Sequence, residues 1–182
     1  MKMSRAWAMP SPETFSIKPI ADLLDRYIKR GDVVVDPFAR NSKRGTITND
    51  LDPSTTALFH LHAEEFCRVL RTDGVVADVV LFDAPYSPRQ VTEVYAGIGK
   101  TATMQDTQTA VLYKEVRNGL SVVLKTGGIA VSFGWNSAGF GKERGYDMLE
   151  ILLVAHGGAH NDSICVVERK TQTTLEIGDE KD

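Results

Sequence analysis

The chemistry that this sequence could perform is concentrated in residues 79–87, where four apolar residues end in Asp83-Ala84-Pro85-Tyr86. The apolar part has the length and residue types of a buried strand. Ligands of open α/β sheets collect at the carboxyl ends of such strands, so Asp83 and Tyr86 are expected at the mouth of a cleft. Pro85 fixes its own φ and holds Ala84 extended. The stretch therefore offers a carboxylate, an open carbonyl and an aromatic ring, which together suit a planar ring bearing an exocyclic amine.

Acids also follow two earlier apolar segments, because Asp36 ends one short strand-like run and Asp50 ends the next. Asp50 is placed to bind ribose hydroxyls, as acids do in dinucleotide-binding folds, although the G-x-G-x-x-G fingerprint is absent. Asp36 could accept from a ligand ammonium group or orient the following loop. Each acid alone also fits the capping of a helix, just as residues 83–86 alone fit a plain turn. Acids at successive strand ends favour a ligand site.

The elements that position these residues follow from apolar periodicity. Helices are expected within residues 19–30, 55–70 and 111–124, and strands at residues 32–36, 45–53, 79–82, 129–135, 146–155 and 164–169. Continuous apolar strands that alternate with helices imply a parallel sheet. The last two strands are expected to form an antiparallel hairpin at the sheet edge. Residues 89–110 show little periodicity and fit either a loop over the cleft or a plain connection.

The 182 residues suffice for one domain, with residues 1–14 expected as an N-terminal arm, 15–170 as the domain and 171–182 as a polar tail. A net charge of −3 gives no global attraction for nucleic acid, so binding to a polyanion must use a local patch. Cys67 and Cys165 lie in apolar contexts and are expected to be buried free thiols. With no signal core and no membrane-spanning run, the sequence predicts a cytoplasmic protein.

The histidines do not predict a metal site. His156 and His160 are four residues apart, but the intervening Gly157 and Gly158 argue against a helix, so a loop role is expected. His60 and His62 lack a neighbouring set of carboxylates and cysteines. No phosphate-binding loop and no nucleophile elbow is present in the sequence.

Four segments, in this order, resemble the S-adenosylmethionine-dependent DNA amino-methyltransferases of the adenine type. Residues 15–20 resemble the motif that contacts the methionine part of the cofactor, 35–40 the D-P-F-x-G cofactor loop, 49–51 the acidic strand end that holds the ribose, and 83–86 the D-P-P-Y catalytic motif. The resemblance spans about residues 15–170 and is to small, single-domain, phage-like members. It implies an α/β fold, a Rossmann-like seven-stranded methyltransferase sheet with helices on both faces and a C-terminal antiparallel hairpin.

The resemblance also implies a function and a set of site residues. The function is methyl transfer from S-adenosylmethionine to adenine N6 in DNA. The implied catalytic residues are Asp83, Ala84, Pro85 and Tyr86, and the implied cofactor-binding residues are Phe15, Ser16, Lys18, Asp36, Pro37, Phe38, Asn49, Asp50, Leu51 and His62. In this scheme the amine hydrogens face the oxygens of the catalytic motif, and Tyr86 stacks on a base flipped out of the duplex.

Three residues depart from the family pattern. Ala84 replaces the first proline of the catalytic motif, Arg40 replaces a glycine of the cofactor loop, and His62 lies where an acid is usual. No separate target-recognition domain is expected, which predicts short or relaxed sequence preference unless a second subunit or a homodimer supplies the readout. The alternatives are an inactive methyltransferase-like subunit that binds a partner or nucleic acid, a cytosine-N4 enzyme, and a methyltransferase acting on RNA or on a protein amide.

Overall fold

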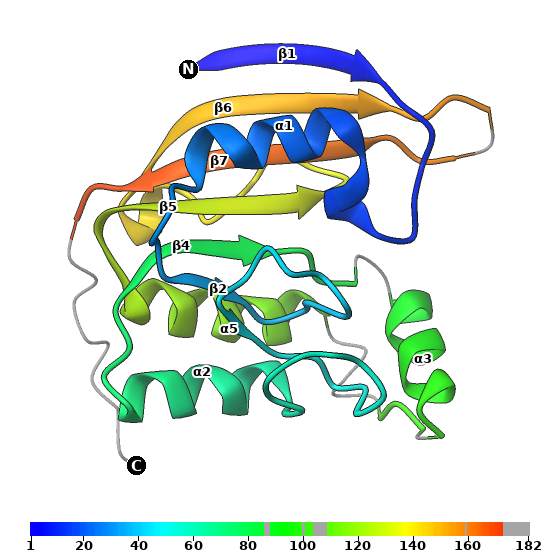
Figure 1. Cartoon of the computed structure of the whole chain (residues 1–182), viewed down its shortest axis with the longest axis vertical. Coiled ribbons are helices and arrows are strands. Elements are labelled where there is room, and N and C mark those ends of the chain that lie inside the picture. Colours follow the sequence, from blue (N-terminus) through cyan, green and yellow to red (C-terminus); the bar gives the residue numbers. More distant parts are fainter. Residues whose placement is uncertain (86–87, 100, 104–108, 159, 173–182) are drawn as a thin grey trace.

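Seven strands form a single mixed sheet in the computed structural model (Figure 1), which describes residues 1–85, 88–99, 101–103, 109–158 and 160–172. The strands are β1 (Lys2–Trp7), β2 (Val34–Asp36), β3 (Ile47–Thr48), β4 (Ala77–Phe82), β5 (Leu124–Gly134), β6 (Tyr146–Ala155) and β7 (Ser163–Lys170). Their order across the sheet is β1-β6-β7-β5-β4-β2-β3. Only β7 runs antiparallel to its neighbours, β5 and β6. The predicted seven-stranded α/β fold with a C-terminal antiparallel pair is confirmed.

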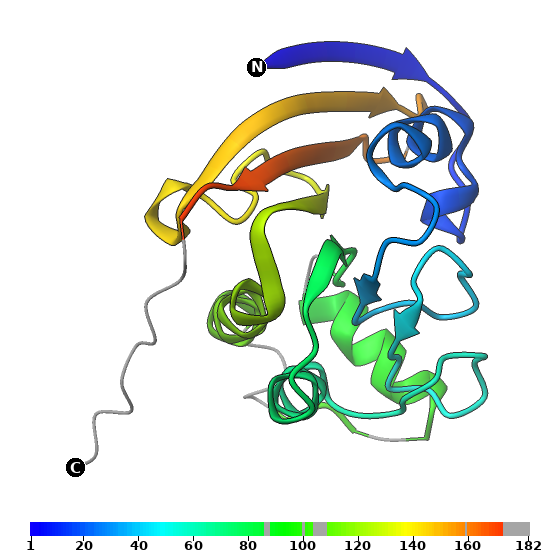
Figure 2. The same cartoon turned by 60° about the vertical axis from the view of Figure 1, so that its left-hand side comes forward.

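Helices cover both faces of this sheet (Figure 2). The α-helices are α1 (Lys18–Tyr27), α2 (Ala63–Thr72), α3 (Pro88–Gly97) and α5 (Thr109–Val123), and 3-10 turns span Thr14–Ser16 and Lys142–Arg144. One core cluster joins α1 to the sheet through Ile20, Leu23 and Leu24. The other cluster joins α2 and α5 to the opposite face through residues such as Phe66 and Leu120. The three helices expected from periodicity are all present, so the periodic faces do form the core.

The N-terminal segment corrects one expectation. Residues 1–14 were expected to form an arm, but Lys2–Trp7 pairs in parallel with β6 over its whole length. This strand, rather than the β6–β7 pair, is therefore the edge of the sheet (Figure 1). The residues that face the core are small, such as Ala6, whereas Met3 and Trp7 are 70% and 65% exposed. Because the large apolar side chains point outward, the segment lacks the pattern of a buried strand.

Two other elements differ from the periodicity. The strand expected at residues 45–53 is only Ile47–Thr48, continued by an isolated bridge from Asn49 to Phe59. Part of the unperiodic segment 89–110 forms α3, at the carboxyl ends of the strands (Figure 1). Of its side chains, Val91 and Tyr95 are buried, so its apolar face is too small to give a strong helical signal.

Cys67 and Cys165 are free and buried, as expected. Among the helices that the structure describes, none has the length and apolar character needed to span a bilayer. His156 is buried, and its two ring nitrogens lie 2.8 Å from the Ala8 carbonyl oxygen and 2.9 Å from Ser163 Oγ. These contacts give His156 a role in holding the loop after β6 against the segment after β1.

Candidate functional site

A cleft of about 920 Å³ opens at the carboxyl ends of the parallel strands β2, β3 and β4. Loops after each strand, the start of α2, and parts of α3 and α5 form its walls. The predicted site residues that line it are Pro37, Phe38, Asn49, Asp50, Leu51, His62, Asp83, Ala84 and Pro85. The strand-end rule therefore brings most of the sequence-predicted residues together in one place.

Asp50 is held in a fixed orientation at the cleft wall. Its Oδ2 accepts a hydrogen bond from the Arg40 backbone N–H (2.9 Å), and its Oδ1 accepts one from the Asp52 N–H (2.9 Å). Each carboxylate oxygen has two lone pairs, so capacity remains to accept hydrogen bonds from a ligand. This geometry suits a pair of ligand hydroxyls, because the two oxygens are already aimed by the backbone.

Asn49 lines the cleft, but its side chain is committed to the protein. Its Nδ2 donates to the Pro37 carbonyl (3.1 Å) and to the Leu61 carbonyl (3.0 Å), and its Oδ1 accepts from the Leu61 N–H (2.9 Å). Asn49 is fully buried, so these bonds are shielded from water. The side chain joins the loop after β2 to the segment before α2 and thereby positions two walls of the cleft.

Three residues of the first predicted motif lie elsewhere. Phe15 is buried in the core, Ser16 Oγ donates to a backbone carbonyl of its own turn (2.7 Å), and Lys18 pairs with Asp22 on the surface. None of the three lines the cleft, although Thr14, the residue immediately before the motif, does. The residue next to the cleft is thus the one that precedes the motif, and none of the residues that the resemblance indicated lines it.

Three of the four residues that were predicted to be catalytic lie at the cleft. Asp83, Ala84 and Pro85 follow β4 directly and line the cleft, while Tyr86 lies outside the described residues. An aromatic ring that the sequence analysis missed, Tyr113 of α5, completes this wall. Its ring centroid is 5.7 Å from that of Phe82, and burial raises the pKa of its hydroxyl. No local motif marks Tyr113, because α5 reaches the site only through the packing of the two core layers.

The comparisons with known proteins concern the fold. NSun6 of Pyrococcus horikoshii, in complex with SFG, matches with a TM-score of 0.58 and 16% identity over 84% of this chain and 50% of that chain. An rRNA methylase of Streptococcus thermophilus matches with a TM-score of 0.52 and 12% identity over 90% of this chain and 98% of that one. The N-methyltransferase NodS of Bradyrhizobium japonicum matches with a TM-score of 0.56 and 9% identity over 85% of this chain and 96% of that chain.

The chain has the methyltransferase fold. It spans about half the length of NSun6, and nearly the full length of the rRNA methylase. No protein-family model matches the sequence, and no curated protein matches it.

Arg40 stands where the resemblance leads one to expect a glycine in the predicted cofactor loop, and its backbone has a conformation typical of glycine. Arg40 has φ +50° and is the one non-glycine with positive φ among the described residues. This left-handed conformation is the one that glycine adopts readily. Its Nη1 donates to the Pro12 carbonyl (2.7 Å), which gives the side chain a partner at the rim of the cleft. The backbone therefore keeps the shape of a glycine loop with a charged side chain added.

His62 is the residue immediately before α2, and its Nδ1 lies 3.3 Å from the Tyr95 hydroxyl. The family pattern usually has an acid at this position, where this chain has His62. An acid is present two residues later, because Glu64 in the first turn of α2 also lines the cleft. Glu64 and Tyr95 were not among the predicted residues. Glu64 could have been predicted from the sequence, because it is an acid in the first turn of a helix expected to begin at the carboxyl ends of the strands.

Asp36 lies behind the cleft wall and does not line it. It is fully buried, its Oδ1 accepts from the Phe38 N–H (3.2 Å), and its Oδ2 has no hydrogen-bond partner among the described residues. Burial raises the pKa of this carboxyl to about 8, opposed by the Phe38 N–H and reinforced by the charges of Asp83 and Asp50. A buried carboxyl oxygen without a partner, next to Pro37 and Phe38 of the cleft, fits a site for a ligand that brings positive charge.

Proposed function

We propose that the chain is an S-adenosylmethionine-dependent methyltransferase that acts on the exocyclic N6 amine of adenine in DNA. The observation that carries the proposal is the convergence of two strand-end acids, Asp50 and Asp83, at one cleft of a methyltransferase fold, with the buried Asp36 directly behind the wall of that cleft. The complex of NSun6 with SFG, an analogue of S-adenosylmethionine, supports the choice of cofactor. The N-methyltransferase NodS, of the same fold, supports an amine as the acceptor.

The residues present fit this cofactor. Asp50 is oriented to accept hydrogen bonds from the ribose hydroxyls, Glu64 offers an acid at the start of α2, and Asp36 has an unused oxygen beside the loop after β2. When bound, S-adenosylmethionine supplies a methyl group on a positively charged sulfur, which needs alignment more than further activation.

The catalytic motif prepares the acceptor. The Asp83 carboxylate and the Ala84 carbonyl accept the two hydrogens of the amine, which withdraws the nitrogen lone pair from conjugation with the ring. Asp83 is also the base that the motif offers for the proton that the amine loses. Because the carbonyl belongs to the backbone, replacement of the family proline by Ala84 leaves this acceptor in place.

A direct test is mass analysis of nucleosides after the protein has been incubated with DNA and isotopically labelled cofactor. Labelled N6-methyl-2′-deoxyadenosine is expected in the DNA digest, and the absence of label from every nucleoside at millimolar cofactor would overturn the proposal. RNA is a second candidate acceptor, favoured by the rRNA methylase that this chain matches over nearly its whole length. Parallel incubation with RNA distinguishes the two acceptors, and cytosine is scored in the same digest.

The proposal extends to the setting of the reaction. A net charge of −3 predicts few phosphate contacts, and therefore binding that is weak, strongly dependent on salt and of short or relaxed sequence preference. A second subunit or a homodimer would supply further readout. A cytoplasmic location, where cofactor and nucleic acid are both present, accords with this function.

A further inference from the structure

A second, smaller hollow of about 230 Å³ lies beside the cleft, at the carboxyl ends of β4 and β5. It shares Ala84, Pro85 and Tyr113 with the cleft. Its other walls include Phe82, Arg117, Ser132, Trp135 and Asn136. Because the catalytic motif forms the partition between the two spaces, a group bound in the hollow lies next to the oxygens of that motif.

Two buried polar atoms of this hollow have no hydrogen-bond partner among the residues that the structure describes. The guanidinium carbon of Arg117 lies 4.5 Å from the centroid of the Phe82 ring, and its buried Nε has no hydrogen-bond partner among the described residues. Ser132 is 6% exposed, and its Oγ likewise has no partner there. Buried donors and acceptors are nearly always paired in folded proteins, because leaving them unpaired is costly. A ligand in the hollow would supply the missing acceptors.

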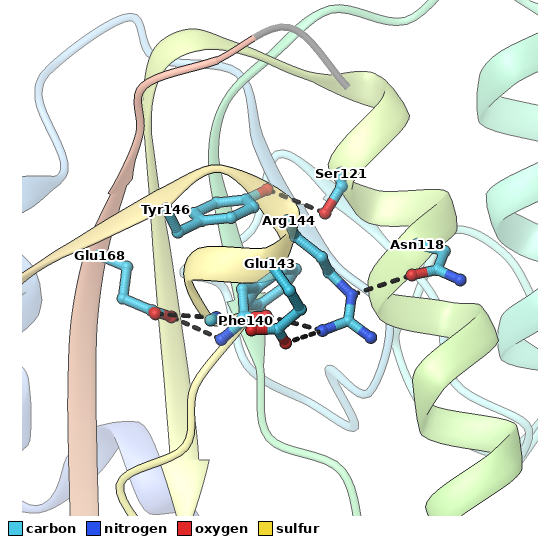
Figure 3. Close-up of polar contacts among 8 residues, drawn as sticks. Asn118, Ser121, Phe140, Glu143, Arg144, Tyr146 and Glu168 are labelled. Atoms are coloured by element: carbon cyan, nitrogen blue, oxygen red, sulfur yellow. Dashed lines mark hydrogen bonds and ion pairs between the residues drawn. The ribbon is translucent and has the colours of Figure 1, made fainter. Parts of the chain in front are cut away.

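The wall of the hollow after β5 is anchored from behind (Figure 3). Glu168 of β7 accepts from the backbone N–H groups of Phe140 (2.6 Å) and Gly141 (3.0 Å). Arg144 donates from Nε to Asn118 of α5 (2.9 Å) and from Nη1 to the Phe140 carbonyl (2.8 Å). These bonds tie the loop that begins with Trp135 to both β7 and α5. The hollow is therefore formed before a ligand arrives, which reduces the cost of binding.

We propose that this hollow receives the ring of the base whose amine is methylated, and that Arg117 donates a hydrogen bond to an acceptor atom of that ring. The proposal rests on the proposed function, because it places the acceptor of the same reaction. The residues that line the hollow favour a base over a phosphate as its ligand. Phe82, Tyr113 and Trp135 offer aromatic surface, whereas Arg117 is the one cation among the described residues that line the hollow. A phosphate site would be expected to gather several donors instead.

The proposed hydrogen bond from Arg117 to the ring also fits the arrangement of atoms on the base. In adenine a ring nitrogen that accepts hydrogen bonds is bonded to the carbon that carries the amine. With the amine at Asp83 and Ala84, the ring and its acceptors extend into the hollow. Flipped bases are read in this way, by stacking on aromatic side chains and by hydrogen bonds to the pairing edge.

The chain contains its own reporter for this test. Trp135 lines the hollow and is 46% exposed, and the second of the two tryptophans, Trp7, lies on the far edge strand. In a Trp7→Phe protein all tryptophan emission therefore comes from Trp135. Titration with single-stranded oligodeoxyadenylate and, in parallel, oligoriboadenylate is expected to quench this emission, while anisotropy of a labelled strand reports binding independently. An unchanged emission with strand bound, or no binding of either strand, overturns the proposal.

Variants identify the donor. Arg117→Met in the same background is expected to weaken the binding that quenches Trp135 by about tenfold to a hundredfold, the usual worth of one hydrogen bond to a charged group. Arg68→Met, which removes the same charge from the exposed face of α2, is the matched control and is expected to change the affinity less than threefold. Equal affinities for the two variants refute the role of Arg117. If Arg117→Met does not fold, Ser132→Ala and Arg117→Lys replace it, and each is expected to weaken binding.

The proposed function is scored separately, by calorimetry with S-adenosylhomocysteine and by methyl transfer. Cofactor binding and methyl transfer without a change in Trp135 emission would refute the placement of the base in the hollow and leave the proposed function standing. Quenching of Trp135 without any cofactor binding would support the placement of the base and refute the proposed function.

Discussion

The fully buried Asp36 makes a quantitative prediction about stability. Burial raises the pKa of its carboxyl from 3.8 to about 8, so the folded protein binds this proton more tightly than the unfolded chain does. The stability contributed by the protonated group is complete below pH 3.8 and is lost as the pH rises toward 8. At about 1.4 kcal/mol per pH unit, roughly 4 kcal/mol has been lost at pH 7.

Asp36→Asn cannot ionise and avoids this loss. The substitution keeps an acceptor for the Phe38 N–H but places an amide nitrogen at the position of Oδ2, which has no partner, at a cost of about 1–3 kcal/mol. The variant is therefore expected to be about 1–3 kcal/mol more stable than the natural protein at pH 7. Near pH 4 it is expected to be equally stable or less stable.

Urea denaturation of both proteins at four pH values between 5 and 8 measures this difference. The stability gap should grow in favour of Asp36→Asn by about 1.4 kcal/mol per pH unit. Asp147→Asn, on an exposed position of β6, is the control and should show no such trend. A gap that stays constant from pH 5 to pH 8 would show that Asp36 does not titrate in this range and that its burial has been misjudged.

Three further predictions concern the loops and the catalytic motif. Arg40→Gly is expected to change stability by less than about 1 kcal/mol, because relief of the strained left-handed backbone offsets the lost hydrogen bond to the Pro12 carbonyl. Arg40→Val keeps the strain and loses the bond, so it should destabilise the protein by about 1–2 kcal/mol. Thermal denaturation compares the two variants, and equal losses of stability would contradict this account. Asp83→Ala should abolish transfer of labelled methyl while calorimetry shows cofactor affinity within threefold of the natural protein, and retained transfer would reassign the motif. Gly139→Ala should cost about 2–4 kcal/mol in urea denaturation, because its Cβ would lie 2.2 Å from Glu168 Oε2 at φ +58°. Gly31→Ala, where φ is +95° but no atom lies within 4 Å of the new Cβ, is its control and should cost only about 1–2 kcal/mol.

The sequence indicated the parts of the fold whose burial follows a regular period. The faces of α1, α2 and α5 and the span of β6 are readable because each element packs one continuous side against the core. By contrast, β1 turns its small residues inward, and α3 buries only two of its described side chains. Neither arrangement leaves a periodic apolar pattern.

Some residues of the candidate site could likewise be predicted from the sequence and others could not. Asp50 and Asp83 could be located because acids after parallel strands share one edge of a sheet. Tyr113 and Arg117 could not, because they lie on α5 and reach the site only through the way that helix packs. Asn49 was identified as a site residue, but its structural role depends on three hydrogen bonds to loops that the sequence does not place.

The parallel pairing of β1 with β6 delays the folding of β1 during synthesis. The Glu150 carboxylate of β6 pairs with Lys2 and Arg26 and accepts a hydrogen bond from the Tyr27 hydroxyl. Because β1 is translated before β6, it has no partner strand until β6 has been made. Until then Met3 and Trp7 are carried on an unpaired edge that can associate with other chains. Closing so long a loop is slow relative to local helix formation. A nascent chain stalled before residue 146 would expose this strand to chaperones.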